Sequence, residues 1–420
     1  MKKNGFFMLG VLALVLTFGL VLAGCGDDRS GDSTSPPAPT VTGVTVSPAP
    51  ASVAKGATQS FTADVTGTNS PAQTVTWSIN ETGKNAGTTI DTTGKLTVAT
   101  DEALTSLTVK ATSTVDTTKS GTASVTVTAG APNWRAVTYG GASGSEKFVA
   151  VGATGVMAYS TDGETWTKVT DTKFDNFNDI TYGGGKFVAV GEDQTWVVGE
   201  NLGMMVYSTD GETWTAVTDT KFLYQYIYGI TYGGGKFVAG GATGVMAYST
   251  DGETWTNVTD TKFGTQISCI TYGGGKFVAG GSYGVMAYST DGETWTKVTD
   301  TKLGTGPGFS IGGVTYGGGK FFAVGNGMAY STDGETWTAV ATQIRCITYG
   351  GGKFVGVGAS NKMYYSTDGE TWTAVTTSPF GPTDNIRKIT YGGGKFVGVG
   401  IGTMAYSTDG TSWTVVTFSP

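Results

Sequence analysis

The sequence predicts an all-β protein, a β-sandwich followed by a seven-bladed β-propeller, and three observations support this fold class. Glycine accounts for 68 of the 420 residues, more than twice its ordinary share. Short stretches of alternating apolar and polar residues run along the chain, separated by Gly, Pro, Asn or Asp. From residue 134 onward one motif recurs seven times. These features indicate many short strands joined by tight turns.

The composition excludes several classes of function. The chain contains no histidine, so Ser-His-Asp and Cys-His triads, His-ligated zinc and imidazole proton shuttling are all excluded. Its net charge of −7 disfavours a nucleic-acid partner, because phosphate binding needs a positive surface. We therefore expect no nucleic acid, no metal and no cofactor.

Residues 1–24 have the pattern of a lipoprotein signal peptide. A basic start, Met1 to Lys3, precedes an apolar run from Phe6 to Leu22. The run ends in Leu-Ala-Gly-Cys25, which resembles the bacterial lipobox and implies lipidation of Cys25. Residues 25–40 are polar and rich in Ser and Pro, as in a flexible tether. We expect a lipid-anchored protein of the cell envelope, on the outer membrane or cell surface. An uncleaved membrane anchor is the alternative, and it also places the rest outside the cytoplasm.

Residues 41–129 predict the first globular unit, because six short stretches in it alternate apolar and polar residues. These stretches are Val41–Val46, Gln59–Val65, Thr74–Ile79, Lys95–Val98, Leu107–Thr112 and Ala123–Thr128. The order V-x-V-x-P, G-x-T-x-x-F, V-T-W-S-I and G-x-L-T-V resembles the bacterial Ig-like group 2 (BIG2) domain. The resemblance implies an Ig-like β-sandwich in which Trp77 takes the place of the buried core tryptophan, without a cysteine pair. Such a domain serves as a stalk or, alternatively, as a direct adhesive module.

Residues 130–420 consist of seven repeats, each beginning with the anchor V/I-T-Y-G. The anchors start at Val137, Ile180, Ile230, Ile270, Val314, Ile347 and Ile389. Each continues through a glycine turn, a K-F strand, a M-x-Y-S-T-D-G strand and a final T-W-T strand. Four short strands repeated seven times predict a seven-bladed β-propeller, with an open β-solenoid as the alternative. No terminal strand obviously latches the ring, so its closure must depend on packing between blades 7 and 1.

The segment S-T-D-G-E-T-W resembles the Asp-box of sialidase-type propellers, although it is one residue shorter than the common S-x-D-x-G-x-x-W form. We expect its Asp and Ser side chains to accept hydrogen bonds from backbone N–H groups of the hairpin turn, rather than to form metal or catalytic sites. The carboxylates are Asp162, Asp210, Asp251, Asp291, Asp333, Asp368 and Asp409. The tryptophans expected to pack between blades are Trp166, Trp214, Trp255, Trp295, Trp337, Trp372 and Trp413.

Functional residues are expected where the repeats differ. The constant glycine turns and Asp-box hairpins fall on one face of the disc, and the variable connections on the other. The position two residues before each anchor varies, and we expect it to ring the mouth of the central channel. Its occupants are Arg135, Asn178, Tyr228, Ser268, Gly312, Arg345 and Arg387. Three of the chain's four arginines occupy this position on neighbouring blades 6, 7 and 1, with Lys388 beside them. They predict a site for a carboxylate, sulfate or phosphate, or they simply make contacts with the acidic surface.

A second predicted patch is aromatic and comes from the longest insertions around blade 2. It contains Trp196, Tyr224 and Tyr226, together with Tyr228 of the ring. Exposed aromatic residues at this density suit contacts with a protein or a glycan, and burial beneath the longer loop is the alternative. Cys269 and Cys346 precede anchors of non-adjacent blades, so we expect two free thiols.

The predicted function is a monomeric surface lipoprotein whose propeller binds a glycan or protein ligand through its variable face, and which is not an enzyme. One alternative is an assembly or docking factor for envelope proteins. Another is a sialidase-like glycoside hydrolase, because sialidases also hold a carboxylate with three arginines. That activity requires a carboxyl group of raised pKa near Tyr228 and Asp179, and no motif assigns one.

Overall fold

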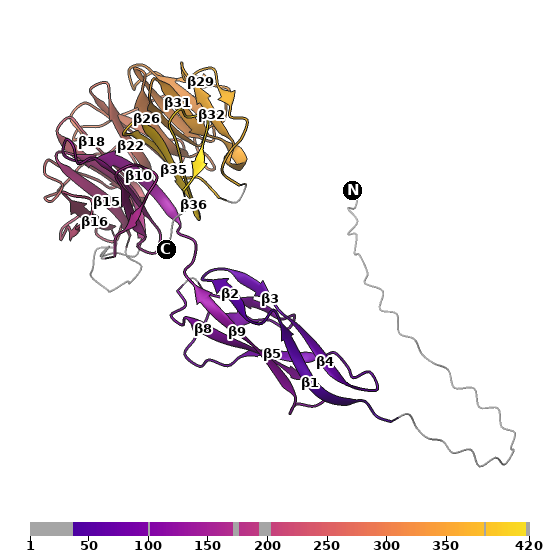
Figure 1. The fold of residues 1–420 in the computed structure, drawn as a ribbon. Coiled ribbons are helices and arrows are strands. Elements are labelled where there is room, and N and C mark those ends of the chain that lie inside the picture. Colours follow the sequence, from indigo (N-terminus) through magenta and orange to yellow (C-terminus); the bar gives the residue numbers. More distant parts are fainter. Residues whose placement is uncertain (1–36, 100, 171–175, 193–202, 382–383, 417–420) are drawn as a thin grey trace, which may run out of the picture.

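A computed structural model describes residues 37–99, 101–170, 176–192, 203–381 and 384–416. The described chain is all-β and contains two single 3-10 turns, η1 (Ala242–Gly244) and η2 (Ala359–Asn361), but no α-helix. Within these ranges no helix is long and apolar enough to cross a membrane. The predicted signal peptide, Cys25 and Trp196 lie outside the described residues. The strands form two lobes joined by one connection (Figure 1).

The N-terminal lobe contains nine strands in three sheets, with the orders β2-β9-β8-β5, β3-β7-β6 and β1-β4. They are β1 (Thr40–Ser47), β2 (Ala51–Ala54), β3 (Thr58–Ser60), β4 (Thr62–Thr68), β5 (Val75–Ile79), β6 (Thr89–Ile90), β7 (Lys95–Thr97), β8 (Ser106–Ser113) and β9 (Ser120–Thr128). Phe61, Leu96 and Val109 are buried in one core shared by these sheets. All six stretches expected from the alternating pattern contain strands.

The structure corrects the expectation for Trp77. Its side chain packs against the core but is only partly buried. The reason is that β5, which carries Trp77, is an edge strand with β8 as its only partner. The ring lies against Gly94, where an added Cβ would be 2.8 Å from the indole.

The C-terminal lobe contains seven four-stranded sheets, and each sheet is formed by consecutive strands of one repeat. The innermost strands are β10 (Trp134–Gly140), β14 (Asn176–Gly183), β18 (Ile227–Gly233), β22 (Ile267–Gly273), β26 (Ile311–Gly317), β30 (Cys346–Gly350) and β34 (Lys388–Gly392). The second strands are β11 (Lys147–Gly152), β15 (Lys186–Glu192), β19 (Lys236–Gly241), β23 (Lys276–Gly281), β27 (Lys320–Gly325), β31 (Lys353–Val357) and β35 (Lys395–Gly400).

The outer half of each blade contains two short strands. The third strands are β12 (Met157–Ser160), β16 (Gly203–Ser208), β20 (Met246–Ser249), β24 (Met286–Ser289), β28 (Met328–Ser331), β32 (Met363–Ser366) and β36 (Thr403–Ser407). The fourth are β13 (Thr167–Lys168), β17 (Thr215–Ala216), β21 (Thr256–Asn257), β25 (Thr296–Lys297), β29 (Thr338–Val340), β33 (Thr373–Ala374) and β37 (Thr414–Val415). The seven anchors all lie in innermost strands, as predicted.

The blades pack through the last two residues of the T-Y-G motif. The terminal glycine of each inner strand lies under the tyrosine of the next blade, so that a Cβ at Gly233 would be 1.9 Å from Cγ of Tyr272. The same contact joins Gly392 of blade 7 to Tyr139 of blade 1. Asn133 also pairs with Ile401 in an antiparallel bridge. The ring is therefore closed, which excludes the open solenoid, and a short bridge supplements the packing that was expected to close it.

The Asp-box turns have the structural role expected of them. In blade 3, Asp251 Oδ1 accepts the N–H groups of Glu253 and Thr254 at 2.8 and 2.7 Å, while Ser249 Oγ accepts that of Gly252 at 2.8 Å. Partial burial raises the pKa of Asp251, but these hydrogen bonds outweigh it and lower the pKa to about 2. Equivalent bonds recur in all seven blades.

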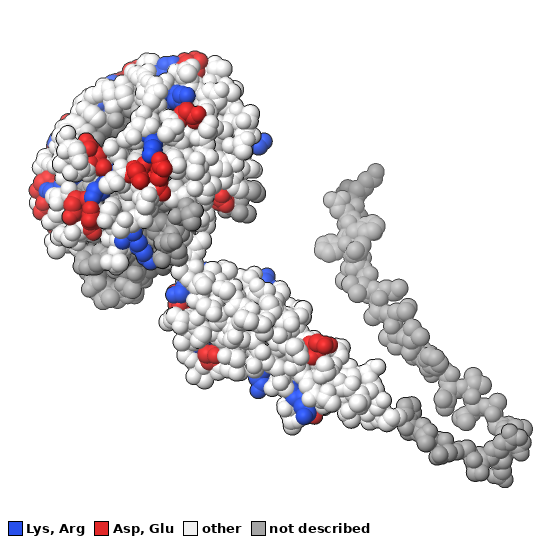
Figure 2. All heavy atoms as spheres, viewed as in Figure 1, with Lys and Arg blue, Asp and Glu red and all other residues white. Residues whose placement is uncertain are grey.

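The lysine that starts a second strand joins neighbouring blades by an ion pair. Lys395 of blade 7 donates to Glu164 Oε1 at 2.5 Å and to the carbonyl of Asp162 at 2.8 Å, both in blade 1. Five other blades make the same pair with the blade that follows. Acidic and basic side chains accordingly adjoin on the propeller surface (Figure 2). These contacts place the glycine turns and Asp-boxes on one face, which leaves the variable connections on the other.

The Asp-box tryptophans divide into two groups. Four of them, Trp214, Trp255, Trp295 and Trp337, are buried. Trp166, Trp372 and Trp413 are partly buried and pack against the apolar clusters between blades. All seven thus belong to the blade packing.

Candidate functional site

The candidate site is the central cavity of the propeller, which has a volume of about 310 Å³. Every innermost strand contributes to its lining, and all seven positions of the predicted ring are among the lining residues. Four cationic side chains line it, Arg135, Arg345, Arg387 and Lys388, against one carboxylate, Asp179. The cavity is therefore positively charged in a chain whose net charge is −7.

A β-bulge explains how five of the seven ring residues reach the cavity. Strand alternation directs every second side chain toward the channel, which accounts for Asp179 and Thr181. In blade 2 the register shifts between Phe177 and Asp179, so Asn178 is the extra residue and also lines the cavity. The same shift occurs in blades 1, 3, 4 and 5. It adds an outer layer of variable side chains above the regular ones.

Arg135 is held by residues of blade 2. Its Nη1 donates to Asn178 Oδ1 at 2.5 Å and lies 3.6 Å from Glu192 Oε1. Asn178 in turn donates from Nδ2 to the carbonyl of Ile227 at 2.9 Å. The Nε of Arg135 is buried and has no hydrogen-bond partner among the described residues. The guanidinium is thus held by blade 2, while its buried Nε has no partner among the described residues.

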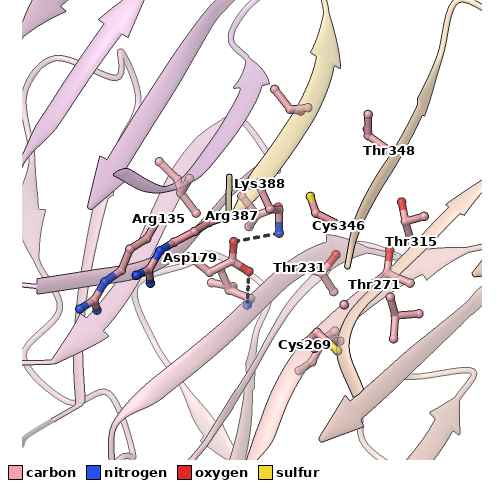
Figure 3. Close-up of a pocket in the computed structure, with 18 of the residues that line it drawn as sticks. Arg135, Asp179, Thr231, Cys269, Thr271, Thr315, Cys346, Thr348, Arg387 and Lys388 are labelled. Atoms are coloured by element: carbon pink, nitrogen blue, oxygen red, sulfur yellow. Dashed lines mark hydrogen bonds and ion pairs between the residues drawn. The ribbon is translucent and has the colours of Figure 1, made fainter. Parts of the chain in front are cut away.

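Arg387 lies beside Arg135 at the cavity mouth (Figure 3). Its side chain is exposed and makes no hydrogen bond or ion pair with the described part of the chain. Burial of part of the group and then the adjacent charge of Arg135 lower the pKa of the Arg387 guanidinium. Two neighbouring guanidiniums, one of them unpaired, form a site that an anion would stabilise.

The third arginine of the predicted cluster is engaged elsewhere. Arg345 also lines the cavity, but its Nε and Nη2 donate to the carbonyl of Gly358 at 3.2 and 3.0 Å. Gly358 belongs to the same blade and directly follows the last residue of β31. The expectation of three converging guanidiniums is therefore corrected to a pair, Arg135 and Arg387.

Lys388 points into the cavity toward Asp179 (Figure 3). Its Nζ lies 3.2 Å from Asp179 Oδ1, and Asp179 Oδ2 accepts the N–H of Ile230 at 3.2 Å. The Asp179 carboxylate raises the pKa of Lys388, and this effect exceeds the opposing effect of burial. Lys388 is therefore a charged, paired group, unlike the exposed Arg387.

Both predicted free thiols are present and both line the cavity. Burial raises the pKa of Cys269 to about 12 and also raises that of Cys346. Thiols with such pKa values remain protonated at neutral pH and are poor nucleophiles. Among the described residues no group of three or more Cys, Asp or Glu side chains is arranged to hold a metal ion.

Two members of the predicted aromatic patch are exposed, while Tyr228 is half-buried. Tyr224 and Tyr226 are 50% and 39% exposed, and the neighbouring Leu223 is 57% exposed. The rings of Tyr226 and Tyr228 meet edge to face at 6.4 Å, which links the patch to the cavity mouth.

Sequence reasoning missed the inner layers of the cavity. Asp179 and Cys346 were noted only as neighbours of the ring, and a ring of threonines, one per blade, was not considered at all. These threonines are Thr138, Thr181, Thr231, Thr271, Thr315, Thr348 and Thr390. The alternating register of the anchor strand could have revealed them, because Thr follows the Val or Ile that starts every anchor.

Comparison with a family model supports the fold. Residues 264–395, from blade 4 to the start of the second strand of blade 7, match the family described as DUF6242 beta propeller domain. The chain is also 50% identical over 74 residues to the major capsid protein of Bacillus phage B103. That match covers 18% of this chain and 16% of the capsid protein, so the chain spans a small part of that protein's length.

Two solved propellers have a similar shape. One is described as YCF48 bound to D1 peptide, with a TM-score of 0.51, 17% identity, and coverage of 69% of this chain and 95% of that chain. The other is YCF48 from Cyanidioschyzon merolae, with a TM-score of 0.50, 15% identity, and coverage of 66% and 94%. Together with the family match they show that the chain contains a β-propeller, a fold that supports ligand binding or protein interaction.

Proposed function

We propose that this chain is a cell-envelope lipoprotein whose propeller binds an anionic group of a glycan or protein at the mouth of its central cavity. The observation that carries the proposal is the pair of adjacent guanidiniums, Arg135 and Arg387, the second of them exposed and unpaired among the described residues. Like charges placed side by side repel each other, and a carboxylate, sulfate or phosphate bound between them would relieve that repulsion. Planar guanidiniums also suit bidentate hydrogen bonds to these groups.

The proposed location in the cell envelope is inferred from the first 25 residues. The proposed role of a stalk that carries the propeller is inferred from the lobe that follows. The basic start, the apolar run and the lipobox-like Leu22 to Cys25 support export and lipidation. The nine-stranded lobe supports an Ig-like stalk, because its sheets share one core without a disulfide. Mass spectrometry of the mature N-terminus tests the address, because a Cys25→Ser variant should lack the acyl groups.

The ionic contacts of the two carboxylates near the cavity mouth favour binding over hydrolysis. A glycosidase needs one carboxylic acid that can donate a proton to the leaving group. Asp179 is paired with Lys388 at 3.2 Å, and Glu192 lies 3.6 Å from Arg135. Each of these carboxylates is thus already engaged with a cationic side chain of the chain itself. A sialidase-like activity therefore has less support than simple recognition.

A docking role for envelope proteins is the second candidate function. It is favoured by Leu223, Tyr224 and Tyr226, which expose apolar surface beside the cavity mouth. Aromatic residues of this kind are typical anchors of protein interfaces. The solved propeller described as bound to D1 peptide is an example of a similar fold with a peptide ligand.

Binding measurements with a matched pair of variants test the main proposal. The full chain, purified in detergent, is titrated with sialyllactose, a sulfated disaccharide and a Glu-rich peptide by calorimetry. Arg387→Gln keeps the size of the side chain and removes no observed contact, so it should not disturb the fold. We expect it to weaken binding of at least one acidic probe about tenfold, the usual scale for one charge-assisted bidentate contact.

Lys297→Ala serves as the control, because Lys297 is an exposed cation on the outer strand β25 and does not line the cavity. It should leave the affinity for acidic probes unchanged. If Arg387→Gln and Lys297→Ala bind the probes equally well, the guanidinium pair is not an anion site. Binding of the peptide alone, reduced in Tyr224→Ala but not in Arg387→Gln, would favour the docking role.

A further inference from the structure

A second concave site lies on the variable face, in a groove between blades 4 and 5. Its volume is about 310 Å³, and it shares no residue with the central cavity. The groove is formed by the turn between β23 and β24, the connection from β25 to β26, and the segment before β22. It is lined by Thr265, Gln266, Ser282, Tyr283, Gly308, Phe309 and Ser310. None of these side chains is charged.

One wall of the groove is Tyr283, which departs from the repeat. The corresponding turns of three other blades carry a small hydroxyl residue with the same left-handed backbone, namely Thr154, Thr243 and Ser360. Tyr283 has a φ of 60° and its side chain is 45% exposed. A bulky residue is unfavourable in this conformation, and the ring is too exposed to be a core residue. Because Thr or Ser completes the same turn elsewhere, folding alone does not explain the tyrosine.

The opposite wall is Phe309, which comes from a separate departure. The connection from Asp300 to Ile311 is four residues longer than the corresponding one from Asp260 to Ile267. The longer connection is tied to the first wall, because the N–H of Gly306 donates to the carbonyl of Tyr283 at 3.0 Å.

The Phe309 ring is also held in place from within its own loop. It packs on Gly304, where an added Cβ would be 2.4 Å from the ring, and it remains 41% exposed. A substitution and an insertion thus place two aromatic rings at one groove, with the loop between them already ordered.

The floor of the groove offers neutral hydrogen-bonding groups. The hydroxyls of Ser282 and Ser310 have no hydrogen-bond partner among the described residues. Gln266 donates from Nε2 to Ser268 Oγ at 3.3 Å, which leaves its carbonyl oxygen available as an acceptor.

From this combination we infer that the groove between Tyr283 and Phe309 binds a neutral saccharide. A pyranose ring has an apolar C–H face, which can stack on an aromatic side chain, and an edge of hydroxyls, which can both donate and accept hydrogen bonds. The uncharged lining offers no partner for an ionised group, whose desolvation would therefore be uncompensated. This site is independent of the anion site at the cavity mouth.

Ligand-observed NMR and calorimetry on the full chain, kept in a non-glycosidic detergent, test the inference. The probes are glucose, galactose, mannose and N-acetylglucosamine, each with a corresponding disaccharide. We expect at least one to bind with a Kd on the order of 1 mM, and Tyr283→Thr or Phe309→Ala to weaken it about tenfold or more. Tyr283→Thr introduces the residue found at the same turn of blades 1 and 3, so this variant should fold even if Phe309→Ala does not.

Two variants serve as controls. Tyr224→Ala removes an exposed aromatic ring outside the groove, and Arg387→Gln removes the unpaired cation of the cavity mouth; both should bind the neutral saccharide as the unchanged chain does. Loss of saccharide binding in Arg387→Gln would instead locate it at the cavity. The inference is overturned if no neutral saccharide binds, if Tyr283→Thr binds as tightly as the unchanged chain, or if an uncharged peptide binds the groove in place of sugar.

Discussion

Closure of the propeller should depend on one glycine, Gly392, at the end of the innermost strand of blade 7. Its backbone φ lies outside the left-handed region, so alanine is conformationally acceptable there. Space is the obstacle, because a Cβ would lie 2.1 Å from Cγ and 2.3 Å from Cδ1 of Tyr139. We expect Gly392→Ala to destabilise the contact between blades 7 and 1.

The magnitude follows from how far Tyr139 can move. Contacts of a real Cβ begin near 3.4 Å, so the ring must retreat by more than 1 Å. Retreat is resisted because Tyr139 packs on Phe148, with ring centroids 4.7 Å apart. Overpacking of this kind costs about 1–3 kcal/mol, and the backbone shift needed here points to the upper end.

A double-mutant cycle measured by urea unfolding tests this reasoning. In the background of Tyr139→Gly the whole obstacle is gone, including the Tyr139 Cβ that would lie 2.4 Å from the new methyl group, so Gly392→Ala should then cost less than about 0.5 kcal/mol. Gly264→Ala is the control, since nothing lies within 4 Å of its Cβ and its φ is ordinary. If Gly392→Ala costs the same free energy of unfolding with and without the Tyr139 ring, the contact does not hold the ring closed.

Three further predictions concern charges and thiols. Asp251 has a pKa of about 2, against 3.8 in the unfolded chain, so its stabilising contribution is complete above about pH 4 and is lost as the pH falls toward 2. Asp251→Asn should therefore lower the free energy of unfolding at pH 7 by about 1 kcal/mol, after allowance for solvent screening. The variant should also show a weaker acid transition by circular dichroism. Because burial raises the pKa of both thiols, Cys269 and Cys346 should react with a disulfide reagent at pH 8 only after unfolding. Lys395→Met removes the ion pair to Glu164 across the closure, and because that pair is partly exposed it should cost only about 0.5 kcal/mol in thermal unfolding, well below Gly392→Ala.

The repeats made the propeller predictable because each blade uses the same residues for the same local purpose. The seven anchors fixed both the number of blades and the innermost strand, and the Asp-box residues make the turn bonds expected of Asp and Ser. The position of the ring residues also followed from their place before the anchor. In each of these cases the physical cause lies within one repeat or between one repeat and the next.

Properties that depend on local details not shared by all repeats were not predictable. The capture of Arg345 by the carbonyl of Gly358 depends on how β31 ends, and the incomplete burial of Trp77 depends on β5 being an edge strand. The groove beside Tyr283 combines a substitution in one turn with an insertion in another connection, and the two lie together only in the folded chain. Each departure is visible in the sequence, but only the folded chain shows that they line the same groove.

The two faces of the propeller differ in how freely they can change. On the face that carries the glycine turns, residues contact the neighbouring blade as well as their own. Gly233 packs against the ring of Tyr272 in the next blade, and Lys395 forms an ion pair with Glu164. A substitution there requires a matching change in the next blade. Among the described residues, Arg387 and Tyr283 make no side-chain hydrogen bond or ion pair with a neighbouring blade, so we expect their replacement to leave the ring intact. Each proposed site includes one residue of this second kind beside a more constrained partner, Arg135 or Phe309, so we expect substitutions at Arg387 or Tyr283 to change ligand preference at little cost to the fold.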